Sequence, residues 1–280
     1  MPPSTKFTIR RATEPDAPHL AHINITAFEP TPFWRNLFPA LDRRATYPLK
    51  LARTLTKLAD SASHLLVAED PATGAVVGYA RWTVPGPPAP ASSGPIALSP
   101  ANQDLVTAFR QAGDGALPPG TNLAIHSRFW GDLERLKAKY LREGDFGAFF
   151  PVFFLGVASF FLFFLGVVVV SKVGDHANSK GLGEGAVLEF LATLPEAQGQ
   201  GVASGLLRWG LERADARNAR VYLEATEEGY PVYRKYGWRD LEVLELDFAG
   251  LGGRSERQRW VMMMRERRDP AGEQSRGLKD

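Results

Sequence analysis

The chain of 280 residues is long enough for one domain with long loops, or for one domain with an insertion. Hydrophobic residues make up 44% of it, which excludes a disordered protein, and a formal net charge of +2 is too small to predict a nucleic-acid-binding surface. The absence of cysteine excludes a cysteine nucleophile, a disulfide framework and a thiolate metal site. It fits a reducing compartment, and the first residues lack the apolar core of a secretory signal, so we expect a cytoplasmic protein.

The first half of the chain carries strand and helix patterns that turn residues separate. Pro30, Pro32 and Pro39 are expected to interrupt regular structure around Trp34, and Ser127 is the expected N-cap of a later helix. In chain order we predict a strand at 7–10, a helix that begins near 13, a helix at 41–58, a hairpin of strands at 64–69 and 76–84, and a loop at 85–100. Two helical patterns follow, and the clearer has Phe129, Leu133, Leu136 and Tyr140 on one face.

The second half of the chain is more regular. A strand at 187–194 leads through a glycine-rich turn into a helix that ends near 217. The remaining predicted elements are a strand at 220–225, a short helix at 231–236 followed by Gly237, and strands at 241–248 and 259–264. The charged tail that follows is expected to be disordered.

The glycine-rich turn at 193–204 joins an apolar strand to an amphipathic helix. Glycines allow close approach of a ligand, and the unpaired amides of a first helical turn favour an anion such as a diphosphate. A P-loop is excluded because no lysine follows the glycines, and a dinucleotide fingerprint fits poorly because Ser204 stands where its third glycine belongs. A plain strand–helix turn stays open on this motif alone.

A second motif follows about thirty residues later, where Tyr233 stands four residues before the pair Gly237-Trp238. With Gln198, Gly201 and Ala203 matching a Q/R-x-x-G-x-G/A element, the chain resembles the GNAT superfamily of acyl-CoA N-acyltransferases. The resemblance implies an α+β fold, with a mixed, mostly antiparallel sheet of about seven strands flanked by helices and an apolar insertion before the fourth strand.

The resemblance also implies the organisation of the chain. Residues 1–146 and 187–265 would be the two parts of one acetyltransferase domain, the first with a long loop and helical insertion at 85–146 and the second binding acetyl-CoA. Residues 147–186 would be an apolar insert, and residues 266–280 a disordered tail.

By the same resemblance, the cofactor would be acetyl-CoA, used as a co-substrate. The pyrophosphate would bind at the glycine-rich turn, and the pantetheine arm would bind the backbone at the splayed end of the fourth strand. The implied binding residues are Leu191, Ala192, Thr193, Gln198, Gly199, Gln200, Gly201, Val202, Ala203 and Ser204. The scattered histidines show no metal-ligand spacing, so no metal is expected.

The family transfers acetyl directly from the thioester to an amine. Tyr233 is the candidate that stabilises the departing thiolate, more by hydrogen bonding than by full proton transfer, because a tyrosine is a weaker acid than a thiol by about 1.5 pKa units. Glu189 is the candidate base. It lies in an otherwise apolar strand, where it would either face solvent or have a raised pKa. A relayed water is one alternative. Glu224 is the alternative carboxylate, although a solvated surface role is expected for it.

The expected reaction is acetylation of an amine in a ternary complex, and the acceptor is a small-molecule or protein amine. Phe33, Trp34 and Trp130 would either line its pocket or belong to the core. The alternative function is a membrane-anchored or catalytically inactive acyl-CoA-binding module. No nucleic-acid partner is expected, and the oligomeric state stays open.

Residues 146–171 contain no charged side chain. A helix of this length would span roughly 39 Å, enough to cross a bilayer, which would make the chain a single-pass membrane protein through 148–170. A crossing would, however, separate the third and fourth strands of one sheet. A buried helix is another reading. A third is a retained intron over 147–185, because Phe, Leu, Pro and Ser have pyrimidine-rich codons.

Overall fold

The computed structural model describes residues 6–40, 43–83, 95–141 and 186–267. The apolar segment 146–171 lies outside the described residues, as do residues 147–185 of the expected insert and residues 268–280 of the expected tail. Within the described residues, no helix is both long enough and apolar enough to cross a membrane.

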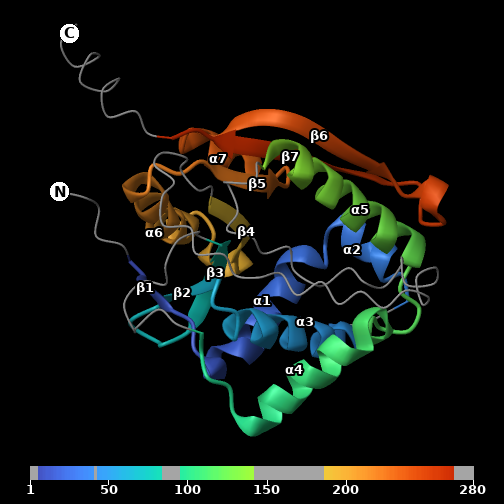
Figure 1. Cartoon of the computed structure of the whole chain (residues 1–280), viewed down its shortest axis with the longest axis horizontal. Helices are drawn as coiled ribbons and strands as arrows, with labels where there is room; N and C mark the ends of the chain where they lie inside the picture. Colours follow the sequence, from blue (N-terminus) through green and yellow to red (C-terminus); the bar gives the residue numbers. More distant parts are fainter. Residues whose placement is uncertain (1–5, 41–42, 84–94, 142–185, 268–280) are drawn as a thin grey trace, which may run out of the picture.

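The described residues form one sheet with helices on both sides (Figure 1). The strands are β1 (Thr8–Arg11), β2 (Ser63–Glu69), β3 (Val76–Thr83), β4 (Ala186–Thr193), β5 (Val221–Ala225), β6 (Arg239–Asp247) and β7 (Arg257–Arg265). The helices are α1 (Ala17–Phe28), α2 (Pro32–Leu37), α3 (Arg43–Leu58), α4 (Pro100–Ala112), α5 (Leu123–Tyr140), α6 (Val202–Ala216) and α7 (Tyr230–Lys235), with short 3-10 turns at Glu14–Asp16, Gly113–Ala116, Pro195–Ala197 and Ala249–Leu251.

The sheet has seven strands in the order β1-β2-β3-β4-β5-β7-β6. Neighbouring strands are antiparallel except for β4 and β5, which run parallel. The parallel pair follows from chain direction, because α6 connects β4 to β5 as a crossover helix. The predicted mixed, mostly antiparallel sheet of seven strands flanked by helices is therefore confirmed.

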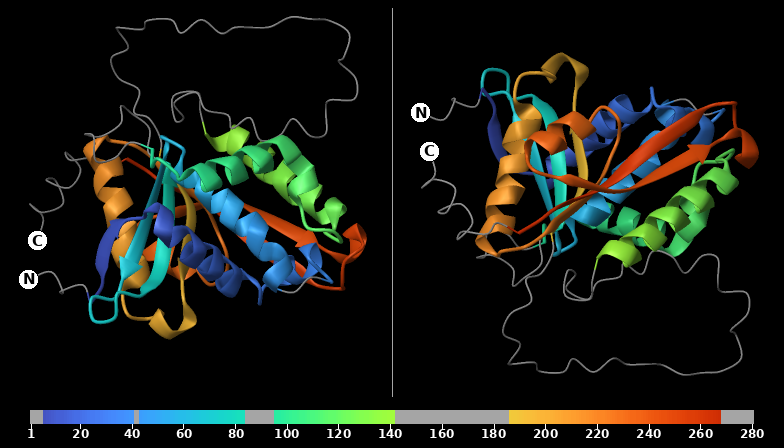
Figure 2. Two further views of the ribbon diagram at one scale, coloured as in Figure 1. Left: turned by 90° about the horizontal axis from the view of Figure 1, so that it is seen from below. Right: turned by 90° about the horizontal axis from the view of Figure 1, so that it is seen from above.

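Helices cover the two faces of the sheet unequally. Figure 2 shows α6 against one face, and α1 and α3 on the other face. Alternation along β5 explains how both faces are packed: Val221 and Leu223 lie in the core beneath α6, whereas Tyr222 lies in the core on the opposite side. The α6 face and the α1–α3 face are used below as the names of these two sides.

One helix, α2, was not predicted, and another, α5, begins earlier than predicted. The prolines around Trp34 do not prevent a helix, because Pro32 occupies the first position of α2, where its missing amide has no cost, and the Thr31 hydroxyl caps the helix by accepting from Trp34 N at 3.2 Å. The N-cap of α5 is Asn122 and not Ser127: its side chain accepts from Ile125 N at 3.1 Å. The wholly buried Ile125 extends the apolar face of α5 by one turn.

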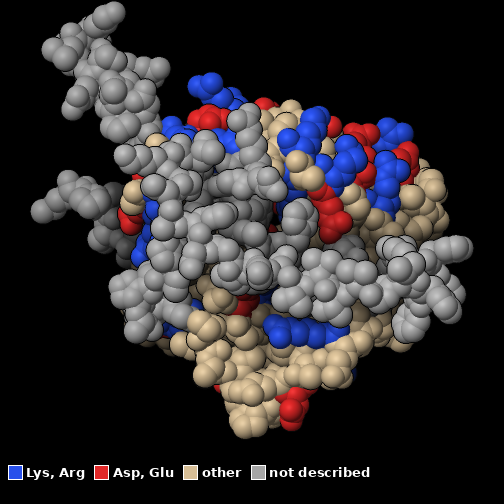
Figure 3. Space-filling model, viewed as in Figure 1, with Lys and Arg blue, Asp and Glu red and all other residues tan. Residues whose placement is uncertain are grey.

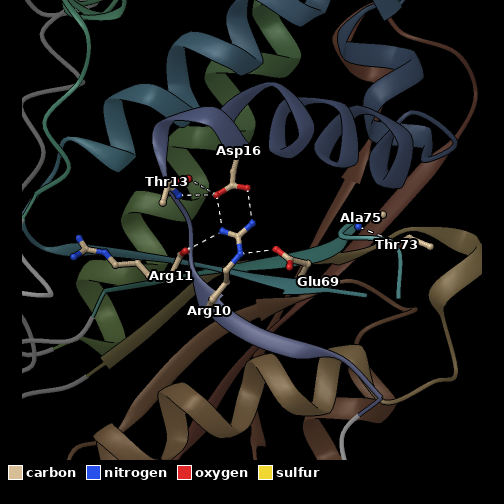
Figure 4. A network of polar contacts seen from close by, with 7 residues as sticks. All are labelled: Arg10, Arg11, Thr13, Asp16, Glu69, Thr73 and Ala75. Carbon is tan, nitrogen blue, oxygen red and sulfur yellow. Dashed lines mark hydrogen bonds and ion pairs between the residues drawn. The ribbon is translucent and has the colours of Figure 1, made fainter. Parts of the chain in front are cut away.

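A partly buried ion-pair network joins the start of α1 to the edge of the sheet (Figure 4). Arg10 on β1 donates to both carboxylate oxygens of Asp16, at 2.8 and 2.9 Å, and to Glu69 on β2 at 2.6 Å. Asp16 also accepts from the amide and hydroxyl of Thr13. Burial alone would raise the pKa of Asp16, but these bonds outweigh it and lower the pKa. The network fixes the entry of α1 onto the α1–α3 face.

The other face depends on close approach of α6 to β3. The ring of Trp82, on β3, is fully buried beneath Gly210 of α6. A Cβ atom at Gly210 would lie 2.2 Å from the Trp82 ring, so only glycine allows this helix–sheet distance.

We predict that Gly210→Ala destabilises the protein by about 1–3 kcal/mol, because a methyl group forces the helix away from Trp82. Gly131→Ala is the matched control. Gly131 lies inside α5 with nothing within 4 Å of its would-be Cβ, so alanine there raises helix propensity and should leave stability unchanged or raise it by up to about 1 kcal/mol. Urea unfolding measures both. Equal effects of the two substitutions would contradict the packing shown for Gly210.

Candidate functional site

The strands β4 and β5 part soon after they begin. Their parallel pairing covers only Ala186 with Val221 and Val187 with Tyr222. On its other edge β4 stays paired with β3 up to Thr193. From Leu188 onward, the β5 side of β4 is therefore an open edge, as the resemblance implied for the fourth strand.

The backbone groups of β4 alternate between β3 and this open edge. Leu194 N donates to Val77 O at 2.8 Å, and the two residues are direct partners in the β3–β4 register. In an antiparallel pair, hydrogen-bonded and non-hydrogen-bonded residue pairs alternate, so Ala192 also directs its backbone groups at β3. Leu191 and Thr193 direct theirs at the open edge. Of the three expected pantetheine-binding residues, these two have the required orientation and Ala192 does not.

A β-bulge at Glu189 explains why side chains change faces along β4. Arg81 pairs with Phe190 and Trp82 pairs with Leu188, which leaves Glu189 as the extra residue. Before the bulge Leu188 packs under α6, and after it Leu191 does so. Glu189 and Phe190 both point to the α1–α3 face, where Glu189 reaches Lys57 of α3 and Phe190 stacks on Tyr79.

The glycine-rich turn brings the start of α6 next to the open edge of β4. Gly199 and Gly201 have φ values of 71° and 89°, in the left-handed region, and Gly201 is the N-cap of α6. The first helical bond runs from Gly205 N to Gly201 O at 3.0 Å. The amides of Val202, Ala203 and Ser204 precede this bond and therefore have no acceptor within the helix.

Two glutamines hold this turn in shape. Gln198 donates to Thr193 O at 3.3 Å, and Gln200 donates to Glu196 O at 2.8 Å. Lys6 in turn donates to the Gln200 side chain at 2.8 Å. The side chain amides of both expected binding residues are thus engaged in the loop itself.

Gly78 contributes to the site and was not found from the sequence. A Cβ atom at Gly78 would lie 2.8 Å from Ala192 O and 2.8 Å from Val202 Cγ1. Its missing side chain lets the first turn of α6 pack directly on the ends of β3 and β4. A glycine inside a predicted strand is the signal that would have pointed to such a close approach.

Tyr233 lies on α7 in the core of the α6 face. It is buried, its ring packs edge-on against Trp238 with 5.9 Å between centroids, and its hydroxyl lies near Gly229. Burial, and next the charge of Glu224 on β5, raise the pKa of Tyr233 above its ordinary value. The phenol therefore stays neutral and can donate a hydrogen bond. Tyr230, on the same helix, instead donates to Asp240 at 2.9 Å near the surface.

The expectation that Glu189 either faces solvent or has a raised pKa is wrong. Its carboxylate lies 2.6 Å from Arg81 Nε and 3.1 Å from Lys57 Nζ, and it accepts from the Thr83 hydroxyl at 2.6 Å. Burial would raise its pKa, but the charges of Arg81 and Lys57 and the bond from Thr83 lower it to about 2. Sequence reasoning could not see these partners because they come from α3 and β3.

The expectation of a solvated surface role for Glu224 is also wrong. Its side chain is only 12% exposed, and it pairs with Lys137 of α5 at 3.2 Å. It lies on the α1–α3 face of β5, next to the wholly buried Tyr222. Burial, and next the charge of Glu224, raise the pKa of Tyr222. The charge of Glu224 also contributes, after burial, to the raised pKa of Tyr233.

The three aromatic residues considered for the acceptor pocket belong to one aromatic cluster. Phe33 packs on Phe129 with ring centroids 4.3 Å apart, Phe129 packs on Trp130 at 5.1 Å, and Trp34 is buried against Phe38. The cluster joins α2 and α5 to the β6–β7 pair. Among the described residues, no group of His, Asp or Glu is arranged to hold a metal ion.

The low pKa of Glu189 predicts a pH-dependent contribution to stability. Because the folded pKa is about 2 and the ordinary value is 4.5, this contribution is full above about pH 4.5 and is lost as the pH falls toward 2. We expect Glu189→Gln to lower the free energy of unfolding by about 3 kcal/mol at pH 7, since Arg81 and Lys57 lose their partner. The difference from the unmodified protein should shrink below pH 4.5.

Urea unfolding from pH 7 to pH 3 measures this difference. Glu245→Gln, which removes an exposed carboxylate from β6, is the control and should stay close to the unmodified protein throughout. A Glu189→Gln deficit of the same size at pH 3 and pH 7 would show that the ion pairs do not hold the carboxylate ionised.

Comparison with known proteins adds to this geometry. The sequence model of the family described as "Acetyltransferase (GNAT) family" matches residues 125–238. Among the curated proteins, none matches the chain. Among solved structures, the C-terminal condensation domain of Ebony, in complex with beta-alanyl-dopamine, is similar with a TM-score of 0.53 at 11% identity, over 94% of this chain and 99% of that chain. The two therefore share a fold.

Two acetyltransferase structures are also similar to the chain. A histone acetyltransferase HPA2 and related acetyltransferase from Corynebacterium glutamicum is 18% identical over 95% of this chain and 98% of that chain, with a TM-score of 0.48. Naa20 of Chaetomium thermophilum, in complex with a bisubstrate analogue, is 17% identical over 93% of this chain and 86% of that chain, with a TM-score of 0.44. The family model therefore identifies a GNAT acetyltransferase domain at residues 125–238.

Proposed function

We propose that the protein is an N-acetyltransferase that uses acetyl-CoA and transfers the acetyl group to an amine by direct attack in a ternary complex. The observation that carries the proposal is the open edge of β4 directly beside the glycine-capped first turn of α6. An acyl-CoA needs one anion-binding site for its pyrophosphate and one extended backbone edge for its amide-containing arm. The chain supplies both, next to each other.

The first turn of α6 is suited to the pyrophosphate. Its amides lack acceptors within the helix, and the positive end of the dipole of this 15-residue helix favours an anion. No side chain obstructs the approach at Gly199 and Gly201, because nothing lies within 4 Å of a would-be Cβ at either position. The residues present therefore fit the phosphate end of the cofactor.

The open edge of β4 is suited to the pantetheine arm. Leu191 directs its amide and carbonyl groups at this edge, and Thr193 directs its amide there, while the Thr193 carbonyl accepts from Gln198. These groups would pair with the amides of an extended arm as a neighbouring strand does. Acetyl-CoA would supply the activated carbonyl there. The cofactor would lie where β5 has left β4, between the sheet and α7.

Tyr233 is the proposed donor to the leaving sulfur. Its raised pKa makes full proton transfer to a thiolate more unfavourable than ordinary values imply, so it acts by hydrogen bonding to developing negative charge. The absence of cysteine from the chain agrees with direct transfer, since no acyl-enzyme on a thiol is possible.

Deprotonation of the amine is proposed to proceed through water next to Glu224 and not through Glu189. A carboxylate with a pKa of about 2 would have to take a proton from an alkyl ammonium some 8 units less acidic, roughly 11 kcal/mol uphill. Glu189 instead fixes Arg81 and Lys57. Glu224 is the other carboxylate on the neighbouring strand β5, and its charge contributes to the raised pKa of Tyr233.

We predict that Tyr233→Phe lowers kcat at least tenfold and changes the affinity for acetyl-CoA little, because only the hydroxyl is removed. Tyr230→Phe is the matched control, since it deletes a hydroxyl on the same helix that bonds only to Asp240. Steady-state CoA release measures kcat, and calorimetric titration measures affinity. If kcat is unchanged in Tyr233→Phe, Tyr233 has no part in the mechanism.

We predict that Gly201→Ala weakens acetyl-CoA binding at least fivefold, because alanine disfavours the left-handed conformation that aims the first-turn amides of α6. Gly120→Ala is the control. Gly120 has a φ of 84° and also has open space around it, so both variants carry the same kind of backbone strain and a similar loss of stability. Equal affinities of the two variants for acetyl-CoA, measured by calorimetry, would place the cofactor elsewhere.

A further inference from the structure

One side of α3 presents three cations to the sheet. Lys50, Arg53 and Lys57 follow one another at spacings of three and four residues, so they share one face of this helix. Lys57 reaches Glu189 on β4, and the charge of Arg81 on β3 acts on both Lys50 and Arg53. We call these four residues, Lys50, Arg53, Lys57 and Arg81, the cationic cluster.

The charges of the cluster do not balance within the described residues. Arg81 and Lys57 share the carboxylate of Glu189, and Lys57 also lies 3.9 Å from Asp60. Lys137, whose charge also acts on Glu189, has its own partner in Glu224. Neither Lys50 nor Arg53 has a carboxylate within ion-pair distance in the described part of the chain. Two positive charges in the cluster are therefore uncompensated.

Both unpaired cations are partly withdrawn from solvent. Lys50 and Arg53 are half-buried, and Lys50 Nζ lies 4.6 Å from the centroid of the buried Trp34 ring. Burial, and next the neighbouring arginines, lower the pKa of Lys50 well below its ordinary value, and burial and Arg81 lower the pKa of Arg53 to about 10. Buried charges are normally paired, because an unpaired one costs several kcal/mol. Binding an anion from outside the chain would offset the free-energy cost of these two half-buried cations.

The cluster lies on the acceptor side of the proposed reaction site. Glu189 is the bulge residue of β4, two residues before Leu191, whose backbone faces the open edge, and Arg81 lies opposite the bulge on β3. The glycine-capped end of α6 packs on the opposite face of the sheet. A molecule held by the cluster would thus reach the open edge of β4 from the side opposite to the pyrophosphate.

The outer surface over α5 and the β6–β7 pair carries charges of both signs (Figure 3). There, Lys and Arg side chains alternate with Asp and Glu side chains over α5 and the β6–β7 pair. Two ion pairs of this surface are Lys139–Glu242 and Arg257–Asp247. The unbalanced charge is a local property of the α3–β3 contact.

We infer that the acceptor is an amine that also carries an anionic group, a carboxylate or a phosphate, and that Lys50 and Arg53 bind this group. The inference rests on the proposed function and names its substrate class. A planar guanidinium next to an ammonium suits either anion, and the same charges repel a purely cationic amine. A basic peptide tail is therefore excluded as the preferred acceptor.

The test is CoA release with amines in matched pairs that differ only in the anionic group. 4-Aminobutyrate against 4-aminobutyramide tests a carboxylate, and phosphoethanolamine against ethanolamine tests a phosphate. A thiol reagent reports CoA without background, because the chain has no cysteine. We expect kcat/KM at least tenfold higher for the anionic member of one pair, and the pair that shows it identifies the anion.

Substitutions on α3 then locate the anion. Arg53→Gln and Lys50→Met should each reduce the anionic preference at least fivefold through KM, and leave the KM for acetyl-CoA unchanged. Arg44→Gln, an exposed arginine on the same helix, is the control and should retain the preference. Because Lys50 and Arg53 have no carboxylate partner among the described residues, both variants should keep or raise the melting temperature, whereas a merely structural role would lower it.

The outcomes separate the two proposals. Equal kcat/KM within every pair, or a preference that survives in both Arg53→Gln and Lys50→Met, would overturn the inference and leave an N-acetyltransferase. Acetyl-CoA binding without CoA release for any amine would overturn the proposed function, and the inference with it.

Discussion

The separation of β4 from β5 is the constraint on which the rest of the structure depends. Two parallel strands that lose their mutual hydrogen bonds after two residue pairs leave a row of backbone groups without a partner in the sheet. Such groups are costly unless water, a side chain or a ligand satisfies them. In this protein β4 stays paired with β3 along one edge up to Thr193, and this pairing supports the strand whose other edge is open. The opening is therefore a property of the sheet and needs no moving part.

The bulge at Glu189 determines which face each neighbour of this opening uses. One extra residue shifts the alternation of β4, so that Glu189 and Phe190 both point to the α1–α3 face and Leu191 returns to the α6 face. The two faces of the sheet next to the opening therefore carry different kinds of group. Glycines and free amides lie on the α6 face, where a phosphate fits, and fixed charges lie on the α1–α3 face.

Glu189 shows how one residue can combine stability with site geometry. Its three partners come from α3 and β3, and they make it the anion at the centre of a cationic cluster. A carboxylate so firmly ionised is a poor proton acceptor, yet it is a good anchor for the cations around it. The same interactions that lower its pKa hold Arg81 next to the open edge of β4. Lys50 and Arg53, in contrast, have no carboxylate partner among the described residues.

The sequence by itself determined the local features: the alternation of the strands, the glycine-rich turn before α6, the position of Tyr233 before Gly237-Trp238, and with them the fold class. These depend on neighbours within a few residues, such as the left-handed conformations that Gly199 and Gly201 adopt. Only the tertiary structure decided that Ala192 faces β3, that Gly78 admits α6, and that Glu189 and Glu224 are ion-paired. The reason is physical. Strand register, β-bulges and ion pairs depend on residues that are far apart in the chain. The pKa of a carboxylate likewise depends on the charges that surround it in space and not on its neighbours in the sequence.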